Sequence, residues 1–225
     1  VRIVRFESLP EKTAELETLL RWRIRETLGF PAEQARLAYQ VTQRKTDGTE
    51  LMVVAVKEDV LAQYEAALDP HQRESASLIL PVTVPLLALL PEQEARGQIL
   101  THVYSGCVTH AIVEGARLRF WRSRLLGQGE TGLVEEVLSE AARAVASARD
   151  RLGIEIGRAW GCIRATEGRE TLSQSLSTVL GMKPQDLPIS PGLDAQLSAE
   201  EKRLFRPFGA PLGAIVASTN YGAAS

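Results

Sequence analysis

Hydrophobic and polar positions alternate along much of the chain, with the two-residue period of strands in some segments and the longer period of helices in others. The most informative stretch covers residues 98–126, where two short Gly-containing turns, Ser105-Gly106 and residues 114–116, separate three β-rich runs. Short turns of this kind between alternating strands predict hairpins. The stretch therefore predicts an antiparallel meander with strands at residues 99–104, 108–113 and 117–126.

Two long amphipathic helices are predicted on either side of the meander. The first spans residues 10–28, with the Ser8 and Glu11 spacing of a capping box at its start and Gly29 at its end. The second spans residues 130–152 and ends at Gly153. In both, apolar residues recur at steps of three and four, which places them on one helical face. The residues of these faces are Leu16, Leu19, Leu20, Ile24 and Leu28, and Val134, Leu138, Ala141, Val145, Ala148 and Leu152.

The same patterns predict the remaining elements and the division of the chain. Further strands are expected at residues 1–6, 36–44, 51–56, 77–81 and 154–163. Further helices are expected at residues 59–68, 84–90, 171–180, 198–205 and 208–217, and a loop at 184–191. The polar run at residues 91–98 is typical of a connector. We therefore expect an α/β protein with two lobes, residues 1–95 and 96–225.

Composition excludes several classes of protein. The 225 residues are 44% hydrophobic and 24% charged, which is ordinary for a globular protein. The net charge of −2 and an aromatic content of 5% argue against a nucleic-acid partner, which needs a basic surface. No apolar run approaches the ~20 residues that span a bilayer, and no signal peptide is recognised. Cys107 and Cys162 form neither a disulfide framework nor a metal-binding spacing, which favours a reducing compartment.

The turn at Gly106 is the main candidate for a binding site. A Gly at the end of a strand can take a positive φ and allows a ligand to approach the backbone closely. The alternative is an ordinary hairpin turn, in which the flanking Tyr104 and Cys107 pack against or cap the hairpin. The local sequence leaves both interpretations open.

Other ionisable residues have structural interpretations beside the functional ones. His102 and His110 lie on neighbouring strands, but no third ligand has a suitable spacing, so ordinary strand histidines are favoured over a metal pair. Four arginines on the third strand could bind an anion or form a solvated face, with two on each side of the strand. They are Arg117, Arg119, Arg122 and Arg124.

The long helix that follows carries acidic candidates. Glu140 and Arg143 lie one helical turn apart and could simply pair with each other. Glu135 and Glu136 could act as general bases only if they reach a cleft. No Ser/His/Asp set and no P-loop sequence is present.

The order of these elements resembles the actin-like ATPase superfamily, and most closely the pilus-assembly PilM proteins and the cytoplasmic part of the type II secretion L proteins. Each motif is weakly specific alone, and the resemblance depends on their shared order over most of the chain. The motifs are residues 9–12 with the long helix, Phe30-Pro31 and Tyr39-Gln40-Val41; residues 51–56 with Val60 and Tyr64; the meander with Arg124, Gly127, Glu140 and Arg143; and residues 208–214.

This resemblance implies a two-lobed, ribonuclease H-like fold around a nucleotide cleft. The family's N-terminal hairpin, which carries the first phosphate loop of D-x-G type, would precede Val1, and the small inserted subdomain would belong to residues 1–95. The second phosphate loop corresponds to Tyr104-Ser105-Gly106, where Tyr replaces the Asp that orders Mg²⁺. Backbone amides could still hold a phosphate there.

The resemblance also implies the site residues. Ser105, Gly106 and Cys107 would form the phosphate turn, and Gly168 would belong to the adenosine turn at residues 165–168. ATP is the candidate cofactor. Neither a catalytic residue nor a metal ligand is predicted.

The function implied by the resemblance is that of a non-enzymatic scaffold in a type IV pilus or type II secretion assembly platform. Such a protein would lie in the cytoplasm at the inner face of the bacterial inner membrane. It would bind the cytoplasmic segment of an inner-membrane assembly protein and contact the membrane only through that partner, with homo-oligomerisation left open. The alternative is an active ATPase or sugar-kinase-like phosphotransferase of the same superfamily.

Overall fold

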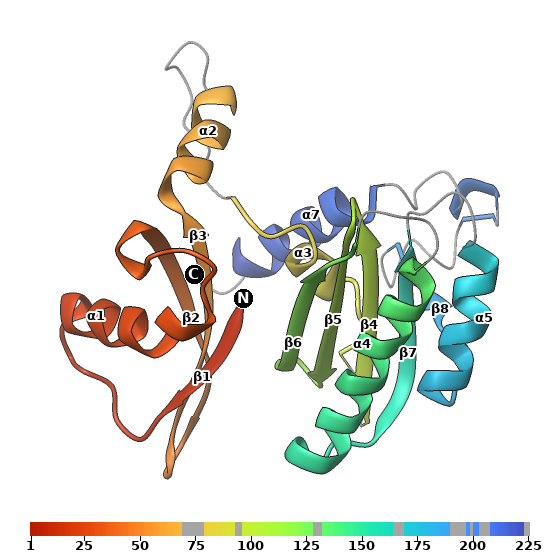
Figure 1. Cartoon of the computed structure of the whole chain (residues 1–225), viewed down its shortest axis with the longest axis horizontal. Helices are drawn as coiled ribbons and strands as arrows, with labels where there is room; N and C mark the ends of the chain where they lie inside the picture. Colours follow the sequence, from red (N-terminus) through yellow and green to blue (C-terminus); the bar gives the residue numbers. More distant parts are fainter. Residues whose placement is uncertain are drawn as a thin grey trace. The chain divides into compact units, whose positions relative to one another are not determined.

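The computed structural model describes residues 1–68, 79–92, 96–127, 132–163, 169–189, 197–198, 200–202 and 208–222. The chain forms two compact units, Val1–Ile79 and Leu80–Ser225 (Figure 1). This division falls earlier than the expected boundary between residues 95 and 96. The physical reason is that the segment after Leu80 packs within the second unit, as described below. The assignment of the two predicted lobes remains a prediction.

The first unit is a three-stranded antiparallel sheet with one helix packed across a face. Its elements are β1 (Arg2–Phe6), α1 (Thr13–Ile24), β2 (Ala35–Lys45), β3 (Gly48–Lys57) and α2 (Glu58–Leu68), with 3₁₀ turns at Arg25–Thr27 and Ala32–Gln34. The strand order is β1-β3-β2. Leu16, Leu20 and Ile24 of α1 pack with Leu51 and Val53 of β3, so the predicted apolar face of α1 forms this core.

The start of α1 differs from the prediction. The helix begins at Thr13, its N-cap residue is Lys12, and no side chain caps it. The capping box expected between Ser8 and Glu11 is therefore wrong. Residues 9–12 do not take helical structure, so Ser8 lies too far from the first helical turn to cap it. The spacing of Ser8 and Glu11 alone was not sufficient to locate the start of the helix.

The second unit contains a five-stranded mixed sheet with helices on both faces. Its strands are β4 (Gly97–Tyr104), β5 (Cys107–Glu114), β6 (Arg117–Leu125), β7 (Ile156–Ile163) and β8 (Gln185–Asp186), in the order β6-β5-β4-β7-β8. Strands β4, β5 and β6 form the predicted antiparallel meander, whereas β7 lies parallel to β4 and β8 parallel to β7. Strand β6 is thus an edge strand of its sheet.

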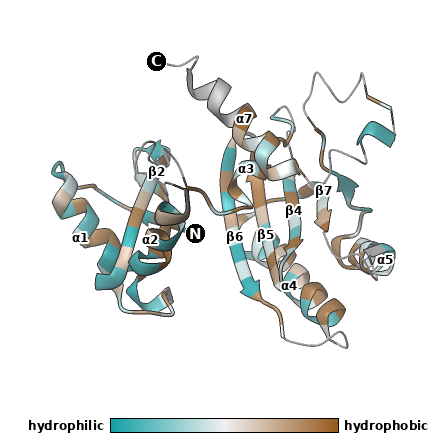
Figure 2. Ribbon diagram, turned by 90° about the horizontal axis from the view of Figure 1, so that it is seen from above, coloured by the Kyte–Doolittle hydropathy of each residue, from teal (hydrophilic) through white to brown (hydrophobic). Residues whose placement is uncertain are grey.

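The two faces of this sheet are covered by different helices. Helices α4 (Leu133–Ser147) and α5 (Arg169–Leu180) pack on one face, where Ile99, Ile112 and Val137 lie in the main hydrophobic core. Helices α3 (Val84–Leu87) and α7 (Gly209–Gly222) pack together on the opposite face (Figures 1 and 2). The backbones of α3 and α7 are so close that a Cβ atom at Gly213 would collide with the carbonyl of Pro85.

Helix α4 does not remain α-helical to its predicted end. A π-helical turn occupies Ala148–Leu152, and Gly153 follows in the left-handed conformation with φ 64°. The amide of Ile154 donates to the carbonyl of Ala148 at 2.9 Å. Gly153 ends the helical segment, as its lack of a Cβ atom predicts.

Several predicted elements differ in length or lie partly outside the described residues. Residues 79–81 do not form the strand expected at 77–81, and α3 ends at Leu87 rather than Leu90. The predicted loop at 184–191 contains the short strand β8. Residues 203–205, the end of the helix expected at 198–205, lie outside the described part, and α7 continues to Gly222.

Candidate functional site

The Ser105-Gly106 turn joins β4 to β5 at one end of the sheet. Both residues have positive φ, 48° at Ser105 and 69° at Gly106, as in the mirror-image turns that suit two-residue hairpins. The Leu126 amide donates to the Gly106 carbonyl at 2.8 Å, which ties the turn to the end of β6. A Cβ atom at Gly106 would have no described neighbour within 4 Å, so the backbone is open to approach. The turn thus has hairpin geometry and an accessible backbone, and both interpretations of Gly106 remain.

Tyr104 and Cys107 pack beside this turn. The Tyr104 ring stacks on the His102 ring with centroids 5.8 Å apart and keeps 39% of its surface exposed. The Cys107 thiol is half-buried and lies 3.7 Å from the carbonyl oxygen of Val108. Tyr104 therefore offers an aromatic ring and no negative charge to this end of the sheet.

The two strand histidines face opposite sides of the sheet. Cross-strand pairing places His110 opposite Thr101 and His102 opposite Thr109, so the two imidazoles alternate between faces. The Nδ1 atom of His102 lies 2.7 Å from Thr83 Oγ1, and the Nδ1 atom of His110 lies 3.1 Å from Thr101 Oγ1. The histidines therefore cannot share a metal ion. No group of three or more His, Cys, Asp or Glu residues suited to a metal occurs within the described segments.

His110 is held in its neutral form by burial. Its side chain is fully buried between the sheet and α4. Loss of hydration lowers the pKa of His110 from 6.5 to about 4, although the negative charge of Glu140 opposes the shift. This imidazole is therefore a neutral part of the core at physiological pH.

Glu140 is the centre of an ion-pair cluster that the sequence predicted only in part. Arg143 Nη1 donates to Glu140 Oε1 at 2.6 Å, as the helical spacing predicts. Arg124 Nη1 also donates to Oε1, at 3.3 Å, and Arg122 donates to both carboxylate oxygens. The Glu140 side chain is 3% exposed, and those of the three arginines are 43 to 54% exposed. A purely solvated face is therefore the wrong interpretation for Arg122 and Arg124.

The electrostatics of this cluster favour a charged carboxylate. Burial of Glu140 by itself raises its pKa, but the hydrogen bond from Arg122 and the charges of the three arginines outweigh it. The pKa of Glu140 is consequently below its usual value of 4.5. Glu140 is ionised at neutral pH and holds three guanidinium groups together.

The other predicted acidic candidates have structural contacts or lie on the surface. Glu136 Oε2 accepts a hydrogen bond from the Gly127 amide at 3.0 Å and so ties the segment after β6 to α4. Glu135 is exposed. Arg119 pairs with Glu114 at 2.7 Å, apart from the Glu140 cluster. No contact of these groups indicates a general base.

The predicted adenosine turn lies outside the described residues, which leave out 164–168 and thus Gly168. The structure accordingly places Ser105, Gly106 and Cys107 at one turn and does not test whether Gly168 adjoins them.

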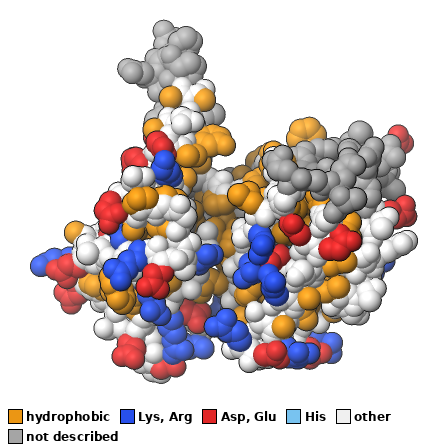
Figure 3. All heavy atoms as spheres, in the orientation of Figure 1, with side chains coloured by type: hydrophobic (Ala, Val, Ile, Leu, Met, Phe, Trp, Pro, Cys, Tyr) orange, Lys and Arg blue, Asp and Glu red, His pale blue; other side chains and the backbone are white. Residues whose placement is uncertain are grey.

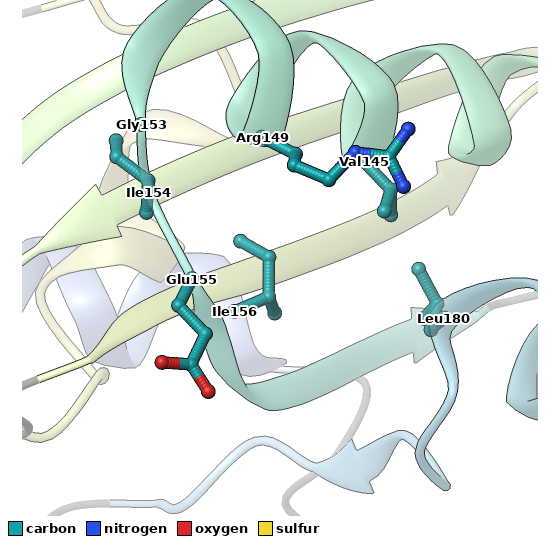
Figure 4. Close-up of a pocket in the computed structure, with 7 residues that line it drawn as sticks. All are labelled: Val145, Arg149, Gly153, Ile154, Glu155, Ile156 and Leu180. Atoms are coloured by element: carbon teal, nitrogen blue, oxygen red, sulfur yellow. The ribbon is translucent and has the colours of Figure 1, made fainter.

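A surface pocket that the sequence did not indicate lies at the other end of the sheet. It is lined by Val145, Arg149, Gly153, Ile154, Glu155, Ile156 and Leu180 (Figure 4). Ile156 pairs with Gly97 at the start of β4, whereas the Ser105-Gly106 turn follows the end of β4. Arg149 pairs with Asp150 at 2.7 Å and Glu155 with Arg96 at 3.3 Å. The remaining lining is apolar apart from Gly153, so this pocket offers no reactive group.

Comparison with known proteins supports the fold. No protein-family model and no curated protein matches the sequence. A chain of a PilM–PilN type IV pilus biogenesis complex matches with a TM-score of 0.66 and 16% identity, over 94% of this chain and 74% of that one. The resemblance to PilM-like, actin-like proteins is thereby confirmed at the level of the fold.

Two further structures are more distant. A Bacteroides thetaiotaomicron protein with an actin-like ATPase fold has a TM-score of 0.49 and 12% identity, over 87% of this chain and 68% of that one. The cytoplasmic domain of EpsL, an inner-membrane component of the Vibrio cholerae type II secretion system, has a TM-score of 0.44 and 13% identity, over 79% and 68% of the two chains. Neither score is high enough to support an argument. Within the described part of this chain, no helix combines the length and apolar character required to cross a membrane.

Proposed function

We propose that the protein is a non-enzymatic, actin-like scaffold of a type IV pilus or type II secretion assembly platform. The observation that carries the proposal is the structural match over 94% of the chain to a protein from a pilus biogenesis complex. That protein was solved as part of a PilM–PilN assembly. By analogy, this protein binds the cytoplasmic segment of an inner-membrane assembly protein and works at the cytoplasmic face of that membrane.

The chemistry at the predicted phosphate turn supports a scaffold over an enzyme. Phosphoryl transfer relies on metal ions that neutralise and position the phosphates. Tyr104 supplies no carboxylate at the turn, and its ring stacks on His102. The turn keeps an accessible backbone at Gly106. These features fit weak nucleotide binding through Ser105, Gly106 and Cys107 without hydrolysis.

The first test is partner binding. The purified protein is titrated calorimetrically with the cytoplasmic peptide of the membrane-anchored assembly protein from its own pilus or secretion system, with a scrambled peptide as the control. We expect saturable binding of the native peptide alone. Equal heats from the two peptides would contradict the proposed partner.

The second test addresses the alternative of an active ATPase or phosphotransferase. Phosphate release is measured under saturating Mg-ATP for the wild type, Gly106→Val and Tyr104→Asp, alongside a calorimetric titration with ATP. We expect no turnover by any of the three, because one restored carboxylate does not rebuild a metal site. Sustained turnover by the wild type that Gly106→Val abolishes would establish the enzyme instead.

A further inference from the structure

The cluster of Arg122, Arg124 and Arg143 around Glu140, here called the arginine cluster, has more positive charge than its internal pairing requires. Three guanidinium groups share one carboxylate. Arg119, the next basic residue along β6, pairs separately with Glu114. The arginine cluster therefore carries a net charge of about +2 at neutral pH, because arginine stays protonated and Glu140 is ionised.

The arginines also have hydrogen-bonding capacity left over. Each guanidinium group has about five N–H donors. Arg124 and Arg143 each contact Glu140 through one nitrogen, and Arg122 through two. All three side chains are about half exposed. A second anion can thus reach the cluster from solvent without displacing Glu140.

Glu140 prepares the cluster for such a ligand. It is buried on α4 and fixes two arginines of β6 and one of α4 in a common position. Arginine side chains lose considerable conformational freedom when they bind, and holding them in advance reduces that loss. Glu140 is a positioning residue in this arrangement.

The position of the cluster on β6 indicates the shape of the ligand. Within its unit, β6 pairs with β5 on one side and is the edge of the sheet on the other. Residues 123–125 are exposed, and Leu125 has 80% of its surface exposed. Basic side chains gather over β6 in the surface view (Figure 3). An exposed edge strand offers unpaired backbone groups to another strand.

Side-chain alternation along β6 indicates which residues a partner strand added beside it would carry. In the strand register Arg122 lies opposite His110 and Arg124 opposite Val108, so both arginines face α4. Ser123 and Leu125 face the opposite side of the sheet. A strand added beside β6 would place every second side chain next to the arginines. The intervening side chains would lie beside Leu125, which favours an apolar residue.

We propose that the end of β6 is a docking edge for an extended, acidic segment of a partner protein, which adds a strand to the sheet. Its alternate acidic side chains bind Arg122, Arg124 and Arg143, and its intervening apolar side chains contact Leu125. This edge borders the Ser105-Gly106 turn, because Leu125 lies opposite Cys107 in the strand register. The proposed contacts use the arginine cluster and the outer side of β6, so the proposal does not rest on the proposed function.

The experiment uses the whole protein and a labelled, end-capped peptide that alternates glutamate and valine, with binding followed by fluorescence anisotropy at low and moderate salt. The first comparison changes only the peptide. We expect replacement of its glutamates by glutamine to weaken binding at least about tenfold, because the contacts are charge-assisted. Two further peptides carry N-methyl groups on alternate amides, one at the odd positions and one at the even positions. We expect only the peptide whose methylated amides face β6 to lose binding.

The second comparison changes the protein. We expect Arg122→Gln/Arg124→Gln to weaken binding of the glutamate peptide about tenfold. The matched control is Arg149→Gln/Arg151→Gln, which removes the same charge from exposed positions away from β6 and should bind as the wild type does. Circular dichroism of both variants verifies that they are folded. The comparison between peptides uses the wild-type protein, so it remains valid even if the Arg122→Gln/Arg124→Gln variant does not fold.

Four outcomes would overturn the proposal. The first is absence of binding by the glutamate peptide. The second is equal loss from both pairs of substitutions, which would indicate non-specific charge. The third is glutamate-peptide binding that N-methylation does not change and that inorganic phosphate or phosphatidylserine vesicles compete away completely, which would indicate a simple anion site. The fourth is a wild-type dimer, seen in sedimentation, that Arg122→Gln/Arg124→Gln dissociates, which would assign the edge to a second copy of this chain.

Discussion

Replacement of Glu140 by glutamine tests whether the buried carboxylate stabilises the second unit. Glu140→Gln keeps the size of the side chain but removes the charge that four hydrogen bonds from three arginines share. It also places an amide NH₂ group, a donor, against guanidinium groups that are donors themselves. Hydrogen bonds to charged groups contribute about 1.5–3 kcal/mol, and leaving a buried polar group unsatisfied costs about 1–3 kcal/mol.

The half-exposed arginines recover hydration when Glu140 is lost, which limits the effect. We therefore expect Glu140→Gln to lower the free energy of unfolding of the second unit by roughly 2–3 kcal/mol at neutral pH. Glu135→Gln is the matched control on the same helix, because Glu135 is exposed, and should change stability by less than about 0.5 kcal/mol.

The assay is urea unfolding followed by tryptophan fluorescence in a Trp22→Phe background. Trp22 belongs to the first unit, and the remaining tryptophans, Trp121 and Trp160, report on the second. Because the folded-state pKa of Glu140 is lowered, its contribution is present above the unfolded pKa near 4.5 and is lost as the pH falls through the lower, folded value. Equal stability of Glu140→Gln and Glu135→Gln at pH 7 would refute this reasoning.

Three other changes test separate parts of the fold. The lowered pKa of His110 means that the free energy of unfolding falls by roughly 3 kcal/mol as the pH drops from about 6.5 to 4, because only the unfolded state binds the proton there. Urea unfolding across that range should show a weaker pH dependence of stability for His110→Gln than for the wild type. Gly106→Ala should lower the free energy of unfolding by about 1–2 kcal/mol through its positive φ alone, since the space around it is open. Gly29→Ala, the control, should lower it little, and the denaturant midpoints of the two variants are compared. Leu16→Asp should unfold the first unit by burying an unpaired carboxylate, which circular dichroism detects, and a cooperatively folded variant would contradict the predicted face of α1.

Local sequence was sufficient for the features that depend on neighbouring residues. The turn at Ser105-Gly106 follows from two strands that alternate on either side of a Gly, and the structure has positive φ at both positions. The apolar face of α4 follows only in part from its helical period: its members Ala141 and Ala148 lie in the core, but the core also contains Val137 and Ala144, which the prediction left out. The Glu140–Arg143 pair follows from their separation by one helical turn. Each of these features has its physical cause within a few residues of the chain.

Tertiary structure alone decided the features that join distant segments. Glu140 contacts Arg122 and Arg124 because α4 packs against β5, the neighbour of β6 in the sheet, and the period of either segment alone does not place one against the other. Strand register sets which side chains share a face, and it puts His102 and His110 on opposite faces. The close approach of Gly213 to Pro85 likewise joins segments far apart in sequence. Sequence periodicity thus determined the buried face of α1 and part of that of α4. The partners of the charged residues depended on packing between elements, because ion pairs form across space rather than along the chain.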